Sequence, residues 1–236
     1  MIGIIQPRGL GDIIIALPIA RYFAKRGRKV LWPIDRRFMT SLERHAPYVA
    51  FLPFDFEDTI ACYADIPEAL LVAQGCSERL VLLSHLEGQS HRIDQRLSVA
   101  LKFDEYKYAI AGVPFAEKWR LEIQRDDKRE QALIRRLDLK APYVLVHRQA
   151  SNCRFDFTPD PSWAPGHRIV EITDLTEDIF DWLGAIEGAA KLVLIDSVFA
   201  NLVDQLGLDN EKYFVLRSSV AFTPVLRGTW TFLSLK

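Results

Sequence analysis

The sequence lacks several patterns that would place the chain in a specialised class. Its three cysteines, Cys62, Cys76 and Cys153, include no C-x-x-C pair, whereas a disulfide framework or a structural zinc site needs paired cysteines. No apolar run approaches the roughly 18 residues of a membrane span. The opening residues also lack the basic segment of a secretion signal. We therefore expect a cytoplasmic protein in a reducing compartment, and leave peripheral membrane contact open.

An excess of charge of one sign is absent as well. The 30 Lys and Arg residues balance 31 Asp and Glu residues, whereas a nucleic-acid-binding domain carries a strongly basic surface. Nucleic acid is therefore not an expected partner. The sequence has an ordinary globular composition, with 49% hydrophobic and 26% charged residues, which is enough apolar material to bury a core.

The first half of the chain alternates between strand and helix patterns. Helical spacing of apolar residues indicates helices over 13–25 and 36–45, and partly over 90–103. Short apolar runs predict strands over residues 2–6, 29–34, 48–53 and 79–84. Strands that alternate with helices are typical of a parallel sheet.

The pattern restarts after a charged helical segment over residues 126–139. Strands are predicted over 143–146, 168–172, 191–195 and 213–216, and helices over 178–188 and 198–206. We therefore predict an α/β fold with two Rossmann-like lobes and parallel sheets. The N-terminal lobe spans 1–125, a linking helix 126–140 and the C-terminal lobe 141–236. Because ligands collect at the carboxyl ends of parallel strands, the two sheets are expected to face a cleft.

Two segments, one in each lobe, resemble the heptosyltransferase family, which transfers heptose from a nucleotide donor during lipopolysaccharide assembly. The run RGLGDIIIALPIARYF at Arg8–Phe23 resembles the family's opening loop, which ends in Gly-Asp, and its helix, which contains Leu-Pro. The run KLVLIDSVFANLVDQLG at Lys191–Gly207 is similar to the family's donor-site strand, Asp-Ser turn and helix. This chain has Val198 and Phe199 where the family has Gly-Pro, and Asn201 where it has histidine.

The resemblance implies a two-lobed, GT-B-like glycosyltransferase of polysaccharide biosynthesis that moves a sugar from a nucleotide-sugar to a glycan or lipid-linked acceptor. The nucleotide-sugar is a substrate, so no cofactor is expected. The sequence has no Asp-x-Asp pair of the kind that holds a metal-bound diphosphate, so we expect no metal ion. A catalytically inactive nucleotide-binding module is the alternative, which the changed donor turn favours somewhat. An NAD(P)-dependent oxidoreductase is disfavoured because Ile14 replaces the third glycine of G-x-G-x-x-G.

The turn containing Gly9, Gly11 and Asp12 leads from the first strand into the first helix. Backbone N–H groups and the helix dipole favour an anion such as a phosphate at this place. Aspartate is also a preferred N-cap residue, so Asp12 could be a helix cap without a chemical role. The resemblance implies instead that Asp12 is the general base that deprotonates the acceptor hydroxyl.

Candidate donor contacts follow two strands of the second lobe. A guanidinium at Arg148 could neutralise the departing diphosphate, whereas His147 is more easily explained as a structural histidine at a strand end. Asp196 and Ser197 precede a helix and are either ligands of the ribose or diphosphate, or helix caps. The predicted donor-binding residues are Arg148, Gln149, Asp196, Ser197 and Asn201, and the predicted phosphate-loop residues are Gly9, Gly11 and His147.

A weaker prediction concerns the acceptor. His85, His91 and Arg92 flank the loop after the strand over 79–84, where an acceptor could be held. Asp35 ends the second strand, the position of a ribose-binding acid in dehydrogenases. Without the glycine fingerprint, Asp35 is better explained as a turn residue.

Overall fold

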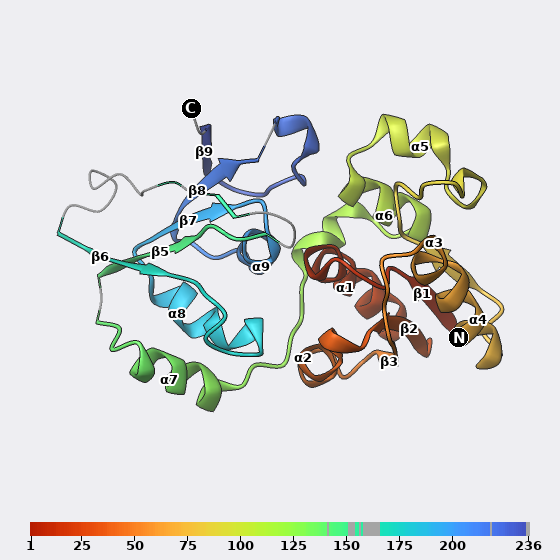
Figure 1. Cartoon of the computed structure of the whole chain (residues 1–236), viewed down its shortest axis with the longest axis horizontal. Coiled ribbons are helices and arrows are strands. Elements are labelled where there is room, and N and C mark those ends of the chain that lie inside the picture. The colour runs from red at the N-terminus through yellow and green to blue at the C-terminus, as the bar shows by residue number, and fades with distance from the viewer. Residues whose placement is uncertain (141, 151–153, 156, 158–165, 218, 235–236) are drawn as a thin grey trace. The chain divides into compact units, whose positions relative to one another are not determined.

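The computed structural model describes residues 1–140, 142–150, 154–155, 157, 166–217 and 219–234. The chain divides into two compact units, Met1–Gln124 and Arg125–Lys236, and each contains one parallel sheet (Figure 1). The α/β class and the two sheets predicted from the sequence are confirmed. No helix in the described part of the chain is long and apolar enough to cross a membrane. Cys62 and Cys76 are buried free thiols, and Cys153 lies outside the described residues.

The first unit has a parallel four-stranded sheet in the order β3-β2-β1-β4. Its strands lie where the apolar runs predict them, although β4 ends three residues earlier than expected. Its neighbour β1 ends at Ile5, and the Leu82 N–H donates to the Ile5 carbonyl. Beyond that hydrogen bond, β1 offers β4 no further backbone to pair with. The strands are β1 (Ile2–Ile5), β2 (Val30–Asp35), β3 (Ala50–Phe54) and β4 (Arg79–Val81).

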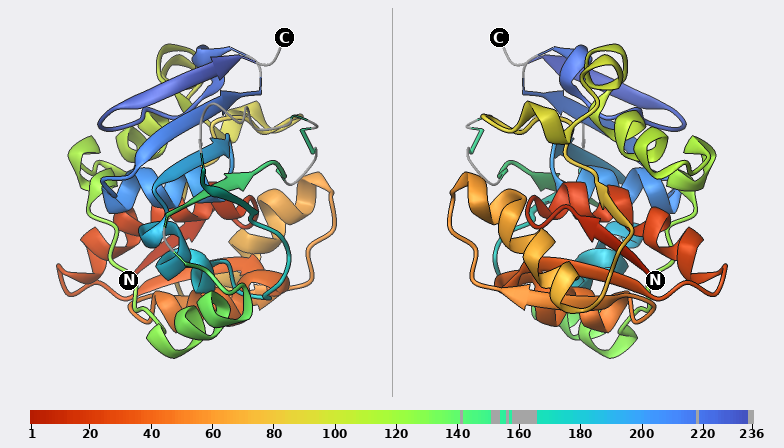
Figure 2. Two further views of the ribbon diagram at one scale, coloured as in Figure 1. Left: turned by 90° about the vertical axis from the view of Figure 1, so that its left-hand side faces the viewer. Right: turned by 90° about the vertical axis from the view of Figure 1, so that its right-hand side faces the viewer.

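Helix α1 (Leu10–Ala24) is the most deeply buried helix segment of this unit, since every residue from Ile13 to Ala20 is buried. The helix predicted over 36–45 is a 3-10 turn, η1 (Arg36–Phe38), that continues into α2 (Met39–His45). Helices α3 (Ile60–Tyr63) and α4 (Asp65–Ala73) pack together (Figure 2, right). The remaining helical segments are η2 (Ser90–Arg92), α5 (Gln95–Ala100), α6 (Phe103–Ala111) and η3 (Phe115–Trp119).

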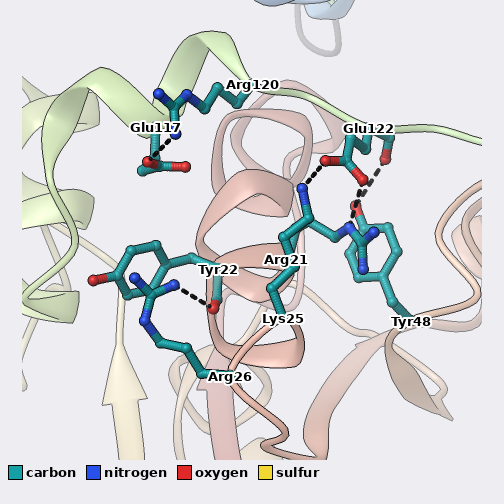
Figure 3. Close-up of polar contacts among 8 residues, drawn as sticks. All are labelled: Arg21, Tyr22, Lys25, Arg26, Tyr48, Glu117, Arg120 and Glu122. Carbon is teal, nitrogen blue, oxygen red and sulfur yellow. Dashed lines mark hydrogen bonds and ion pairs between the residues drawn. The ribbon is translucent and has the colours of Figure 1, made fainter.

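The last segment of the first unit is tied to α1 by polar contacts (Figure 3). The Glu122 carboxylate accepts a 2.7 Å hydrogen bond from Arg21 Nε and pairs with Lys25. The hydroxyl of Tyr48 donates to the Glu122 carbonyl at 3.0 Å. Gln124 N–H then donates to the His45 carbonyl at 2.8 Å. The chain therefore stays attached to the first unit up to its boundary at Gln124.

The second unit has a five-stranded sheet in the order β6-β5-β7-β8-β9, again parallel throughout. Four of its strands lie where the sequence predicts them, whereas β9 was not predicted. Its inward positions are filled by valine and isoleucine side chains such as Val146, Val193 and Ile195. The strands are β5 (Tyr143–His147), β6 (Arg168–Glu171), β7 (Lys191–Ile195), β8 (Glu211–Leu216) and β9 (Trp230–Ser234).

Helix α7 (Asp127–Arg136), in the segment expected to link the lobes, packs on the second unit beside α8 (Leu183–Gly188) (Figure 1). The Arg129 guanidinium makes two 2.7 Å contacts with the Asp181 carboxylate in η5 (Ile179–Trp182). Leu133 is buried there as well. The unit also contains α9 (Val198–Leu206) and η6 (Val220–Phe222).

Candidate functional site

The predicted loop before α1 places an aspartate at the carboxyl edge of the first sheet. Gly9 is the N-cap of α1, with a left-handed φ of 79°, and Gly11 and Asp12 lie in the first turn. Interpreting Asp12 as the N-cap is therefore wrong, because that position belongs to Gly9 and no side chain caps the helix. A Cβ at Gly9 would lie 2.8 Å from Asp12 Oδ2. The glycine is thus required both by its backbone conformation and by the carboxylate above it.

A buried lysine, which the sequence reasoning missed, holds this carboxylate. Lys107 Nζ lies 3.0 Å from Asp12 Oδ1, and the Lys107 side chain is 2% exposed against 39% for Asp12. The same ammonium donates to Gln6 Oε1 at 2.7 Å and to the Leu82 carbonyl at 3.0 Å. Asp12 therefore presents a fixed carboxylate to solvent, at a helix N-terminus that favours negative charge. Such a group can accept a proton from a bound hydroxyl.

A hollow of about 410 Å³ lies at the carboxyl ends of β2 and β3, lined by Asp35, Arg36, Arg37, Asp55 and Phe56. Burial would raise the pKa of Asp35, but hydrogen bonds from Arg37 outweigh that effect and hold the pKa below its usual value. Asp35 also accepts from Arg37 N–H at 3.0 Å, which confirms its interpretation as a turn residue.

The guanidinium of Arg8 lies 4.9 Å from the centre of the Phe56 ring. The hollow therefore combines ionised groups with an aromatic edge. It was not predicted, because its residues come from two separate strand ends.

The three predicted acceptor residues lie elsewhere. His85 and His91 are exposed, and neither they nor Arg92 line the hollow. Arg92 contacts the Asp65 carboxylate at 2.7 Å and pairs with Glu68, so it ties η2 to α4. This ion pairing gives Arg92 a structural role.

In the second unit, the neighbouring strands β5 and β7 bring two predicted residues together. His147 Nδ1 lies 2.9 Å from Ser197 Oγ, and its ring packs edge-on against Phe199 with 4.7 Å between ring centres. Burial lowers the pKa of His147 to about 4, although Glu171 opposes the shift. The imidazole is therefore neutral at neutral pH and joins the end of β5 to the turn after β7.

That turn leaves the start of α9 without a side-chain cap. Ser197 occupies the N-cap position, but its hydroxyl makes no capping hydrogen bond. Asn201 donates from Nδ2 to the Ser197 carbonyl at 3.2 Å, while its buried Oδ1 has no hydrogen-bond partner among the described residues. Asp196 is half-buried directly after β7. The first turn of α9 can therefore accept an anion or another polar ligand.

Arg148 leaves β5 as predicted, but its guanidinium is engaged. Arg148 Nε lies 3.2 Å from Glu171 Oε1, and Nη1 donates to the Phe157 carbonyl at 3.0 Å. Arg154 also contacts Glu171, at 2.9 Å. Hydrogen bonding from Arg148 holds the pKa of Glu171 below its usual value. Gln149 is exposed and forms an isolated antiparallel β-bridge with Arg154. Arg148 and Arg154 share the single carboxylate of Glu171, so this cluster carries a net positive charge that could attract a phosphate.

No group of three or more His, Cys, Asp or Glu side chains is placed to hold a metal ion in the described part of the chain. The candidate site residues are Asp12 with Lys107 in the first unit, and His147, Ser197, Asn201 and the Arg148 cluster in the second.

Comparison with known proteins gives a result for structure and none for sequence. No family profile and no curated protein matches the chain. The glycosyl transferase family 9 structure from Veillonella parvula matches with a TM-score of 0.65 and 14% identity, over 99% of this chain and 85% of that one.

The ADP-heptose LPS heptosyltransferase II of E. coli matches with a TM-score of 0.65 and 13% identity, over 98% of this chain and 89% of that one. E. coli heptosyltransferase WaaC with ADP matches with a TM-score of 0.52 and 12% identity, over 100% of this chain and 91% of that one. The resemblance stated from the two sequence segments is confirmed at the level of the fold.

Proposed function

We propose that the chain is a glycosyltransferase that moves a sugar from a nucleotide-sugar to the hydroxyl of a glycan or lipid-linked acceptor. The observation that carries the proposal is the Asp12 carboxylate, half-exposed at the start of α1 and held by Lys107. The fold shared with transferases whose structures are described with ADP and with ADP-2-deoxy-2-fluoro heptose supports it. The proposal includes a GT-B-like fold, with one parallel sheet in each unit.

In the proposed reaction, Asp12 takes the proton of the acceptor hydroxyl. The oxygen then forms a bond to the anomeric carbon, and the bond between that carbon and the donor phosphate oxygen breaks. The electron pair leaves on the nucleoside diphosphate. Arg148 and the first turn of α9 would stabilise this charge, because guanidinium groups and helix N-termini both favour phosphate oxygens. No step requires a metal ion.

The two units have different proposed substrates. The donor is assigned to the second unit, where Arg148 and Arg154 surround one carboxylate. The acceptor is assigned to the first unit, at the hollow lined by Asp35, Arg37 and Phe56, which suits a polar molecule with a face that packs on an aromatic ring. We prefer this hollow to the loop containing Arg92, because the hollow offers the aromatic ring of Phe56 beside its charged groups.

A nucleotide-binding module without transfer is the second candidate. It is favoured by the donor turn, where Val198 and Phe199 stand in place of Gly-Pro and Phe199 is buried against His147. Such a module would bind nucleoside diphosphates in the second unit and leave Asp12 without a substrate.

The test has two stages. Thermal-shift measurements with ADP, GDP, UDP and CDP against NAD and NADP first identify the ligand class. Nucleotide-sugars of the stabilising base are then incubated with candidate glycans, and released diphosphate and glycosylated product are measured. Transfer supports the proposal. Binding of diphosphates without transfer supports the module, and stabilisation by NAD or NADP alone contradicts both.

A further inference from the structure

We propose that Lys107 is a positioning residue, which fixes the Asp12 carboxylate in the orientation that accepts the acceptor proton. This inference rests on the proposed role of Asp12 as the base. Lys107 lies on α6, far from Asp12 in the sequence, and its side chain reaches the carboxyl ends of β1 and β4.

The geometry of the ammonium group supports a fixed orientation. An ammonium has three N–H donors, and Lys107 Nζ has three acceptors, at 3.0 Å from Asp12, 2.7 Å from Gln6 and 3.0 Å from the Leu82 carbonyl. Gln6 is itself held, because its Nε2 donates to the Arg8 carbonyl at 2.7 Å. Each donor of Lys107 thus has one partner, and moving Nζ away would break all three contacts.

Asp12 is held by Lys107 on one of its oxygens, and the absence of a side chain at Gly9 leaves room for the other. Oδ1 faces Lys107 Nζ, while Oδ2 lies over Gly9, where even a Cβ atom would come within 2.8 Å. Helix α6 is also anchored to α1, because Tyr108, next to Lys107, donates from its buried hydroxyl to the Ile15 carbonyl at 2.9 Å. The lysine and the carboxylate are therefore carried by two helices that are held together.

A second buried lysine in the same unit shows what distinguishes this pair. Lys118 Nζ lies 2.7 Å from Asp104 Oδ2, and both side chains are 0% exposed. That ion pair is entirely internal. In the pair formed by Lys107 and Asp12 the lysine is just as buried, but the carboxylate is 39% exposed. A buried cation beneath an accessible carboxylate is the arrangement expected when the carboxylate has to be both fixed and reachable.

The first experiment needs no substrate. Crystal structures of the wild type, Lys107→Met and Lys107→Gln are compared at the Asp12 side chain. Methionine removes charge and donors, whereas glutamine keeps two N–H donors and guards against a failure of the methionine variant to fold. We expect one ordered Asp12 orientation in the wild type and several in the variants. An unchanged Asp12 orientation in both variants would overturn the inference.

The second experiment is kinetic. A displaced base should lower kcat for transfer by about 10- to 100-fold in Lys107→Met, because a 1 Å misplacement costs up to about that factor. The Kd of the nucleoside diphosphate should stay within about twofold, since that ligand is assigned to the second unit. In Lys107→Ala, added methylammonium should restore part of kcat by filling the vacated place. Loss of donor binding, or no rescue, would argue for a merely structural lysine.

The matched control is the double variant Lys118→Met/Asp104→Asn, which removes the other buried lysine together with its partner charge. It should lower the melting temperature while leaving kcat per folded molecule unchanged. A similar fall of kcat in this control would contradict the special role of Lys107. If the wild type transfers no sugar, the proposed function fails, but the crystallographic comparison still decides whether Lys107 orients Asp12.

Discussion

The carboxyl edges of the two sheets have the same local design but differ in charge. In each unit a turn leads from a strand into a helix, α1 or α9, that has no side-chain cap. The first unit places the carboxylate of Asp12 there, paired with the buried Lys107. The second places the neutral imidazole of His147 there, hydrogen-bonded to Ser197.

The difference teaches which chemistry each edge can support. A carboxylate at the start of α1 can take a proton but would repel a phosphate. The turn at the start of α9 contains Asp196, so an anion there would depend on the backbone N–H groups of α9 and on the nearby guanidinium groups of Arg148 and Arg154. We therefore assign proton transfer to the first unit and diphosphate binding to the second.

The largest expected effect follows from removing the charge of the first edge. Asp12→Asn keeps the size and one acceptor oxygen for Lys107 but loses the basic oxygen. Turnover should fall by about 10² to 10⁴, the usual contribution of a general base, while the Kd of the donor nucleotide stays near normal. The variant should melt somewhat earlier, since Lys107 loses its counter-charge.

Melting temperature, calorimetric nucleotide binding and turnover are measured on the same preparation. A folded, donor-binding and fully active Asp12→Asn would end the assignment of the base to the first unit.

A pH effect tests the neutral edge of the second unit. The pKa of His147 is lowered from 6.5 to about 4 in the folded chain, so between these values the unfolded chain binds a proton that the folded chain does not. The free energy of unfolding should therefore fall as pH drops through this window, by up to about 3 kcal/mol.

Urea unfolding at about pH 7.5 and about pH 5 measures the fall for the wild type and for His147→Gln, which cannot titrate. The variant should lose less stability over the interval. The same loss in both proteins would show that His147 is not a buried neutral group.

The next prediction concerns diphosphate binding in the second unit. Arg148→Ala should weaken binding of a nucleoside diphosphate by about 1.5 to 3 kcal/mol, the value of a hydrogen bond to a charged group. Glu171→Gln is the informative companion, because it frees Arg148 from its carboxylate partner and should not weaken binding. Calorimetry on folded variants measures both, and unchanged affinity in Arg148→Ala would remove this arginine from the site.

The smallest expected effect is that of a chelator. If protein groups alone hold the diphosphate, excess EDTA should leave the transfer rate unchanged. Complete loss of activity that magnesium or manganese restores would show that the second unit requires a cation in addition to Arg148.

The strand pattern of this chain was largely predictable, and the helices less so. Strand β7 has the predicted boundaries because a buried parallel strand is a continuous apolar run. Helix α9 also begins and ends at the predicted residues. Helix α6 was missed because its buried residues include Asp104 and Lys107, which break the apolar periodicity of an amphipathic helix. Strand β9 was missed because only Trp230 among its residues is buried.

The candidate site residues were likewise predicted only in part. The sequence by itself placed Asp12, His147 and Ser197 near strand ends or helix starts, because these positions are set by residues that are adjacent in the chain. Only the tertiary structure decided what these residues contact. Lys107 reaches Asp12, and Glu171 pairs with Arg148, from elements distant in sequence. Local patterns carry no record of such contacts, since they depend on how the helices and strands pack.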